Sequence, residues 1–303
     1  MLSRILPPFL LGVLSFTLHI INTLFWFVPI IVTAFIKFLL PIALLQKIFT
    51  GALNFFATSW ISVNSVIIKM TKPIQWNVTL PKELSTKDWY LVVANHQSWV
   101  DILALQQVLN GKIPFLKFFL KQELLWVPIL GAAWWALDFP FMKRYTKSYI
   151  KKNPHKKGQD FKTTQKACKK FKTLPISVMN FAEGTRFTQA KHASQNSPFK
   201  HLLKPKSGGI GYVLTLMGDE VKQVLNVTIN YPENHRFSFW DFMCGKVRRI
   251  DFHAELVTVP DEVKGSYIEN PETRKATQRW INELWQEKDK QLIRLKQRVE
   301  NEK

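Results

Sequence analysis

Seven residues, from Asn95 to Asp101, combine side chains that could act in acid–base catalysis. His96 lies in the turn after an apolar segment, and Asp101 lies in the first turn of a helix expected to begin near Ser98. A spacing of five does not place two residues on one face of a continuous helix, but a histidine just before the helix can fold back onto the aspartate. The carboxylate would then keep one imidazole nitrogen protonated and leave the other as a general base.

The same residues also fit a purely structural role. Ser98 and Asp101 have the spacing of a helix capping box, and a lone histidine in a turn can be an ordinary hydrogen-bonded residue. Taken alone, this segment leaves both interpretations open.

A second polar segment, Glu183-Gly184-Thr185-Arg186, also follows an apolar run. Its glycine permits a tight turn, and its guanidinium has the planar geometry that binds a phosphate through two parallel hydrogen bonds. By itself, such a segment is more often a charged surface turn.

Both segments must be positioned by the elements around them. Apolar patterns predict strands over residues 89–94, 175–182, 223–231 and 247–259, and a helix over residues 99–109. A last helix is expected to begin at Pro271, with Asn270 as its cap, and to run to about Val299. This alternation predicts an α/β fold with a mixed sheet flanked by helices, in which reactive groups lie at strand ends.

The first seventy residues have a different composition from the rest. Residues 5–36 and 48–68 contain no Asp, Glu, Lys or Arg, and residues 1–82 contain six basic residues and no acidic one. Each stretch is long enough to cross a hydrocarbon core of about 30 Å. We predict an N-terminal hydrophobic membrane-anchoring element over residues 1–72 and a catalytic domain over residues 73–303. Two membrane spans, a re-entrant hairpin and a buried helix pair all remain open.

The chain of 303 residues carries a net charge of +20 together with 23 Phe and 11 Trp. Residues 143–206 alone contain 17 Lys or Arg against two acidic residues. This favours a membrane surface or an anionic substrate as partner, although a solvated face or a nucleic-acid footprint has the same composition. Two distant cysteines exclude zinc ribbons, iron–sulfur clusters and a disulfide framework.

In this order, the two polar segments resemble the lysophospholipid acyltransferase family, which includes PlsC-like 1-acyl-glycerol-3-phosphate acyltransferases. Asn95, His96 and Asp101 match one family block, and Glu183 to Arg186 match another. A block between them is matched by Lys121, Glu123, Pro128, Gly131, Phe141 and Arg144. Residues 202–212 look like the branch that contains bacterial YihG and the lysocardiolipin-type enzymes. Ala182 stands where many relatives have proline, so the reaction type is better defined than the acceptor.

The resemblance implies a role for each matched residue. His96 would take the proton from a lysophospholipid hydroxyl as this attacks an acyl thioester, and Asp101 would orient His96. The acceptor's glycerol phosphate would be bound by Glu183, Gly184, Thr185, Arg186, Lys121 and Arg144. Amides near Gly131 or Gly184 would stabilise the oxyanion, and the aromatic run over residues 115–141 would line an acyl channel or simply pack in the core. No metal or cofactor is implied, and the acyl donor would be acyl-CoA or acyl-carrier protein.

These features together predict a membrane-bound acyltransferase of phospholipid synthesis or remodelling. Its partners would be the bilayer, a lysophospholipid and the acyl donor, with no nucleic acid. We expect it in a bacterial inner membrane with the catalytic domain in the cytoplasm, because acyl thioesters are made there. The alternative is a non-catalytic, membrane-associated lipid-binding protein that retains the fold. A nucleic-acid-binding protein would leave the apolar N-terminal residues without a purpose.

Overall fold

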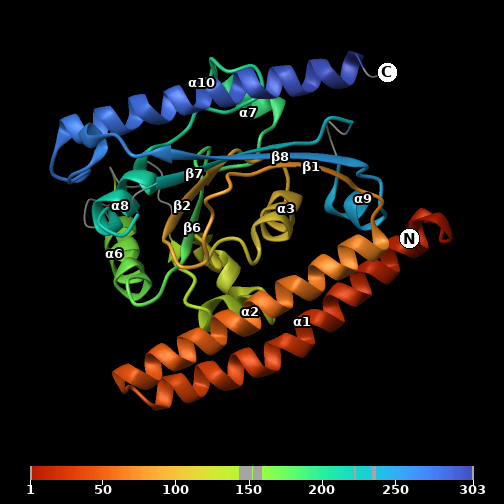
Figure 1. Cartoon of the computed structure of the whole chain (residues 1–303), viewed down its shortest axis with the longest axis horizontal. Helices are drawn as coiled ribbons and strands as arrows, with labels where there is room; N and C mark the ends of the chain where they lie inside the picture. Colours follow the sequence, from red (N-terminus) through yellow and green to blue (C-terminus); the bar gives the residue numbers. More distant parts are fainter. Residues whose placement is uncertain (1, 143–151, 153–158, 222, 234–236, 302–303) are drawn as a thin grey trace.

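A six-stranded sheet lies at the centre of the molecule, in the order β1-β8-β7-β2-β6-β3. The computed structural model describes residues 2–142, 152, 159–221, 223–233 and 237–301 (Figure 1). Neighbouring strands are parallel except β7 and β8, which are antiparallel. The strands are β1 (Gln75–Thr79), β2 (Tyr90–Ala94), β3 (Leu116–Phe118), β6 (Ser177–Phe181), β7 (Gln223–Asn230) and β8 (Arg249–Thr258). The predicted mixed α/β sheet is confirmed, and its four predicted strands correspond to β2, β6, β7 and β8.

Besides the sheet and a helical N-terminal segment, the described residues form further helices, a small two-stranded ribbon and 3-10 turns. The helices are α3 (Val100–Leu109), α4 (Leu130–Ala136), α6 (Gln159–Phe171), α7 (Gln189–Ser194), α8 (Gly208–Met217), α9 (Phe239–Met243) and α10 (Pro271–Asn301). A small ribbon pairs β4 (Leu120–Lys121) with β5 (Phe141–Met142), and 3-10 turns occur at η1 (Leu2–Arg4), η2 (Gln122–Trp126) and η4 (Asp261–Val263).

Helices cover both faces of the sheet, because its central strand is apolar on both sides. All five residues of β2 are buried. Val92 and Ala94 pack with α3 and the N-terminal helices in one core, whereas Leu91 and Val93 pack with α6, α8 and α10 in the other. Alternate residues of a strand face opposite sides, so a continuous apolar run produces a layer of helices on each face.

The last helix, α10, begins where the sequence predicts. Pro271 is its first residue, and the Asn270 side-chain oxygen accepts hydrogen bonds from the amides of Glu272 and Thr273 at 2.8 and 3.4 Å. Trp280, Ile281 and Trp285 are buried against the sheet. This helix closes the face of the sheet opposite to the N-terminal helices (Figure 1).

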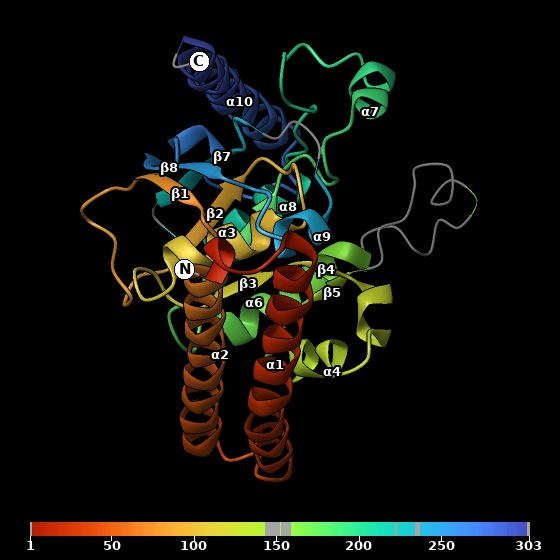
Figure 2. The ribbon, with the colours of Figure 1, turned by 90° about the vertical axis from the view of Figure 1, so that its right-hand side faces the viewer.

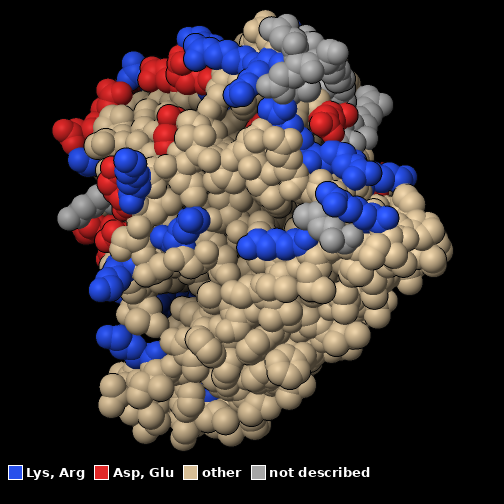
Figure 3. Space-filling model, turned by 45° about the vertical axis from the view of Figure 1, so that its right-hand side comes forward, with Lys and Arg blue, Asp and Glu red and all other residues tan. Residues whose placement is uncertain are grey.

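The N-terminal segment forms an antiparallel helical hairpin, α1 (Pro8–Leu39) and α2 (Ala43–Thr71), which lie side by side (Figure 2). Both helices are long and apolar enough to cross a membrane by length and composition, and they are candidate membrane elements. Many of their large apolar side chains are exposed, among them Phe9, Phe25, Phe38, Leu44 and Phe55. Figure 3 shows a broad hairpin surface almost free of charged residues. A fully buried helix pair would not leave these side chains exposed.

The hairpin lies lengthwise along the rest of the chain. Near one end of α1, a Cβ on Gly12 would meet the Cys244 sulfur, next to α9, at 2.7 Å. Near the other end, Lys37 Nζ forms an ion pair with Asp138 Oδ2, just after α4, at 2.7 Å. Twenty-five residues of helix separate these contacts, which is about 38 Å. The domain therefore follows the hairpin over most of its length.

Candidate active site

The two polar segments of the sequence meet at one edge of the sheet. β2 and β6 are parallel neighbours, with Ala94 paired to Phe181, so the residues that follow them are adjacent. The backbone amide of Phe187 donates to the carbonyl of His96 at 2.7 Å. This edge is where α/β proteins place reactive groups.

His96 and Asp101 form the expected contact. His96 Nδ1 lies 2.8 Å from Asp101 Oδ2, which also accepts hydrogen bonds from the amides of Gln97 and Ser98 at 2.6 and 2.9 Å. The Ser98 hydroxyl accepts from the amide of Val100 at 3.2 Å, but α3 has Trp99 as its N-cap and no side-chain cap. Of the predicted capping box, only the bond from the Ser98 amide to the Asp101 carboxylate forms, because the Asp101 amide donates to the Ser98 carbonyl instead.

The geometry of the histidine defines which nitrogen could act as a base. Because Asp101 can only accept at this position, Nδ1 carries the hydrogen and Nε2 has the free lone pair. Among the described residues none hydrogen-bonds to Nε2, and the side chain is 14% exposed. The imidazole stacks on Phe181, with ring centroids 3.9 Å apart. Phe181 thus packs against one face of the imidazole and Asp101 fixes Nδ1, while Nε2 remains accessible to a substrate.

Tyr231 completes this arrangement, and the sequence analysis did not identify it as a site residue. Its hydroxyl donates to Asp101 Oδ1 at 2.7 Å. Burial and the charge of Asp101 raise the pKa of Tyr231 far above its usual value, so the phenol stays protonated. One feature of the sequence could have identified Tyr231. It comes directly after an apolar strand, as His96 nearly does.

Asn95 joins the turn that carries His96 to β7, the strand that precedes Tyr231. Its side-chain amide donates to the carbonyl of Ile229 and its oxygen accepts from the amide of Ile229, both at 2.9 Å. Asn95 is fully buried. Its role is to tie the turn that carries His96 to β7.

We expect Tyr231→Phe to lower kcat about tenfold and leave the KM of both substrates nearly unchanged. The change keeps the ring but leaves a buried carboxylate oxygen without a donor, which loosens the alignment of Asp101 and His96. Steady-state kinetics of the variant and the parent protein give both kcat and KM. Tyr90→Phe is the matched control. Tyr90, the first residue of β2, is also buried, and its hydroxyl also makes one hydrogen bond, which it accepts from the amide of Ser85. An equal loss in both variants would indicate a general packing effect.

Glu183 occupies a supporting position rather than the expected contact with the acceptor. Its side chain is fully buried, and its two oxygens accept hydrogen bonds from the amides of His96 and Leu203, each at 3.1 Å. Burial raises the pKa of Glu183 to about 8, against the opposing effect of these two amides. A carboxyl group used in this way holds two backbone segments in place and is shielded from a substrate.

Arg186 and Thr185 are the residues of this segment that face outward. The exposed Arg186 guanidinium lies over the ring of Trp99, 4.9 Å from its centroid. Thr185 Oγ1 accepts a hydrogen bond from Lys191 Nζ at 2.7 Å, which places a second cation here that the sequence analysis missed. Two cations on the segment whose Phe187 amide bonds to the His96 carbonyl could bind a phosphate.

The other predicted binding residues are less closely associated with His96. Lys121 is exposed on β4, and Arg144 lies outside the described residues. Gly184 has a positive φ of 69°, as expected for a tight turn, and it lies next to the site.

The amides of Gly131 and Gly184 are not oxyanion donors in this structure. The Gly131 amide donates to the carbonyl of Val127 at 2.8 Å, and the Gly184 amide donates to the carbonyl of Phe181 at 2.9 Å. Each is used to close a local turn. This corrects the expectation for these two amides.

The aromatic run over residues 115–141 divides into two parts. Phe118 is buried and lies 6.3 Å from Phe181 and 6.3 Å from Phe139, so it continues the wall behind His96. Trp126 and Trp135 are largely exposed. Phe118 and Phe139 therefore pack in the core around the site, whereas Trp126 and Trp135 lie at the surface.

Both cysteines are buried and unpaired. Burial raises the pKa of Cys168 to about 12, so its thiol is not a nucleophile near neutral pH. Within the described ranges, no three His, Cys, Asp or Glu side chains gather as a metal site would require.

Comparison with known proteins agrees with this geometry. Residues 75–222 match the family model described as Acyltransferase. The human 1-acyl-sn-glycerol-3-phosphate acyltransferase gamma is 26% identical over 215 residues, which cover 67% of this chain and 52% of the human protein. The mouse delta enzyme is 27% identical with the same coverage. The chain spans about half the length of these curated relatives.

A solved structure shares the fold. The crystal structure of the 1-acyl-sn-glycerophosphate (LPA) acyltransferase PlsC from Thermotoga maritima matches with a TM-score of 0.50 and 16% identity, covering 91% of this chain and 95% of that chain. The part of the chain that is similar to the Acyltransferase family model, residues 75–222, contains both polar segments of the site.

Proposed function

We propose that this protein transfers a fatty acyl group from acyl-CoA or acyl-carrier protein to the free hydroxyl of a lysophospholipid such as 1-acyl-glycerol-3-phosphate. The observation that carries the proposal is the His96–Asp101 pair, in which Nδ1 faces the carboxylate and Nε2 has no hydrogen-bond partner among the described residues. The reaction would serve phospholipid synthesis or remodelling.

The pair can perform the chemistry by a direct route. Nε2 of His96 takes the hydroxyl proton as the acceptor oxygen forms a bond to the thioester carbonyl carbon. The carbon–sulfur bond then breaks, and the proton on His96 passes to the departing thiolate. Asp101 stabilises the imidazolium that forms between these steps. The chain's own residues thus supply the base, its orientation and the charge compensation.

The defining experiment is thiol release from acyl-CoA by the purified full-length protein, with and without lysophospholipid. Acceptor-dependent release supports the enzyme. The alternative, a non-catalytic lipid-binding protein that keeps the fold, predicts lipid binding without thiol release. The open Nε2 favours catalysis, because a purely structural histidine would gain nothing from an exposed nitrogen.

We expect Arg186→Ala to raise the KM for the acceptor about tenfold or more and to change the KM for the donor little. One charge-assisted contact with the acceptor phosphate is lost, while the donor keeps its own contacts. Arg186→Lys should restore only part of the affinity for the acceptor, since an ammonium group lacks the planar arrangement of N–H donors of a guanidinium. Arg274→Ala, at an exposed site on α10, is the control. Equal weakening of both substrates would assign Arg186 to the donor or the fold.

We propose further that the hairpin lies in one leaflet of a membrane, with the catalytic domain on the cytoplasmic side of a bacterial inner membrane. Contacts about 38 Å apart along α1 support this arrangement. If both helices crossed the hydrocarbon core of about 30 Å, the attached polar domain would have to enter it. An in-plane hairpin places its apolar surface in lipid and leaves the domain in water.

This arrangement predicts where the hairpin tip can be labelled. In sealed vesicles, a Leu44→Cys variant should never react with an impermeant maleimide from the side opposite to the catalytic domain. A Lys264→Cys variant marks the domain side, and the buried native cysteines give little background. Labelling of the two positions from opposite sides would establish two spans. Removal of residues 1–70 should weaken membrane retention and activity on lipid.

We propose also that the chain belongs to the branch that contains YihG and the lysocardiolipin-type enzymes, and the pattern of residues 202–212 supports this proposal. Thiol release measured over a panel of lysophospholipids tests this placement. A preference for an acceptor larger than 1-acyl-glycerol-3-phosphate would support it.

A further inference from the structure

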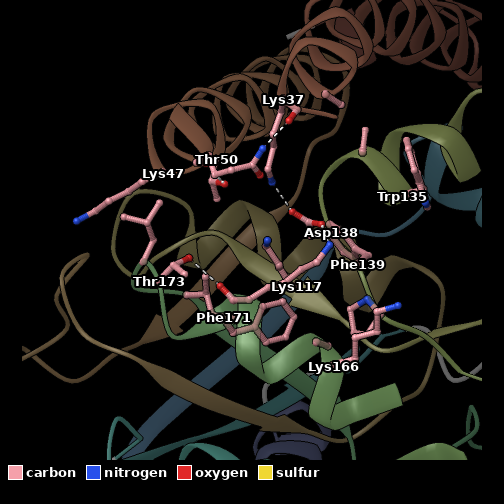
Figure 4. Close-up of a pocket in the computed structure, with 18 of the residues that line it drawn as sticks. Lys37, Lys47, Thr50, Lys117, Trp135, Asp138, Phe139, Lys166, Phe171 and Thr173 are labelled. Atoms are coloured by element: carbon pink, nitrogen blue, oxygen red, sulfur yellow. Dashed lines mark hydrogen bonds and ion pairs between the residues drawn. The ribbon is translucent and has the colours of Figure 1, made fainter. Parts of the chain in front are cut away.

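A large cavity lies between the tip of the hairpin and the catalytic domain, away from His96 (Figure 4). Its volume is about 1020 Å³, enough for a ligand of the size that protein pockets bind. The walls come from the facing ends of α1 and α2, from β3, from the end of α4 and from α6.

The polar lining of the cavity is strongly cationic. Five lysines and one aspartate line it: Lys37, Lys47, Lys117, Lys166, Lys170 and Asp138. The aspartate is already engaged, because Lys37 and Lys170 both form ion pairs with it. Figure 4 shows Lys37 and Asp138 pointing toward one another, with their ion pair drawn as a dashed line. The remaining lysines therefore give the cavity an excess of positive charge.

Lys117 is the most informative of these residues. It comes from the middle of β3 and is only 3% exposed. Its Nζ lies 5.3 Å from the centroid of the Phe171 ring, and no carboxylate of the described residues lies within ion-pair distance of it. Burial lowers the pKa of Lys117 to about 8, so the ammonium remains mostly charged at neutral pH. A buried charge without an anionic partner is costly, and an anion in the cavity would compensate it.

Apart from Gln46 and three threonines, the rest of the lining is apolar and continues toward the exposed apolar surface of the hairpin. It includes Ala34, Phe38, Trp135, Phe139, Phe171 and Ile176, and Phe38 is itself 74% exposed. A cavity that joins cationic and apolar walls at such a surface suits an anionic amphiphile.

We propose that this cavity binds the phosphate group of an anionic phospholipid, at a site separate from the acyl acceptor. Ile176 precedes β6 and lines the cavity, whereas Phe181 ends β6 and stacks on His96. The five residues of β6 thus separate the two sites by about 16 Å. The site would fasten the tip of the hairpin to a negatively charged lipid surface, and it does not depend on the proposed acyl transfer.

The test measures binding directly, without turnover. Full-length protein in a neutral detergent is titrated against fluorescent phosphatidylglycerol, and anisotropy gives the Kd. Phosphatidylcholine with the same acyl chains is the zwitterionic reference and should bind more weakly. Lys117→Met, which removes the buried charge and keeps the side-chain length, should weaken phosphatidylglycerol binding about tenfold or more.

Three controls separate this site from the alternatives. Lys69→Gln removes a charge from an exposed position near the other end of α2 and should leave the Kd unchanged. Arg186→Ala and His96→Ala should also leave it unchanged, because they belong to the acceptor site. A double change of Lys47 and Lys166 to Gln, both exposed, should weaken binding even if Lys117→Met fails to fold.

The opposite results would overturn the proposal. Equal weakening by Lys69→Gln would mean that binding follows net charge, and weakening by Arg186→Ala but not by Lys117→Met would place the lipid at the acceptor site. Titration with inorganic phosphate or pyrophosphate alone distinguishes the source of the phosphate. Lys117-dependent binding of these ions, without binding of the lipid, would keep the phosphate site but assign it to a soluble ligand.

Discussion

Replacement of His96 by alanine is expected to lower kcat for acyl transfer by about 10²–10⁴-fold while leaving a folded protein that still binds its lipids. The change removes the group that takes the acceptor proton. The fold should survive because Asp101 keeps three donors, the amides of Gln97 and Ser98 and the hydroxyl of Tyr231. Thiol release from acyl-CoA by purified protein measures the loss.

The control for this experiment is His253→Ala, at a half-buried histidine on β8. It should show nearly normal turnover. Thermal unfolding and lipid binding of His96→Ala should match the parent protein. Turnover by His96→Ala close to the parental rate would refute the general-base mechanism, and a collapse of its melting temperature would assign His96 to stability.

The second large effect is expected for Asp101→Asn, with a loss in kcat of about 10²-fold or more. All four partners of the carboxylate are donors: His96 Nδ1, the Gln97 and Ser98 amides, and the Tyr231 hydroxyl. An asparagine can turn its oxygen toward the three N–H groups and its amide nitrogen toward the Tyr231 oxygen, which can also accept. Local geometry is then retained, and what is lost is the negative charge that stabilises the imidazolium.

Asp101→Ala separates this electrostatic effect from the structural one. It leaves four donors in the interior without their acceptor, each at a cost of about 1–3 kcal/mol if it stays unsatisfied. We expect a lower melting temperature as well as loss of activity, whereas Asp101→Asn should lose activity alone. Parental kcat in Asp101→Asn would show that the charge of Asp101 is not used in the reaction.

Local features of the site were predictable because they depend on neighbours in the sequence. His96 and Asp101 are five residues apart, and the turn between them follows from an apolar strand, the Ser98 amide that donates to Asp101 and the helix that begins at Val100. The cap of α10 at Asn270 is predictable for the same reason. In each case the partners are within a few residues, so local conformational preference suffices.

Partners from distant segments required the sheet order. Tyr231 is 130 residues from Asp101 and reaches it because β7 lies next to β2, which no local pattern indicates. Glu183 was expected at the surface, since a carboxylate beside a turn is normally solvated. Its burial depends on two amides, of His96 and Leu203, that only the folded chain brings to it.

The sequence by itself determined the two long apolar N-terminal stretches, four of the six strands of the mixed sheet, the helices α3 and α10 and the local His96–Asp101 pair, because each follows from the pattern of neighbouring residues. The tertiary structure decided how the hairpin lies along the domain, which residue donates to the second oxygen of Asp101, and that five lysines from four elements surround one cavity. These features arise from packing between segments far apart in the chain. Such packing depends on the complementarity of whole surfaces, and it cannot be predicted from the spacing of residues along one segment.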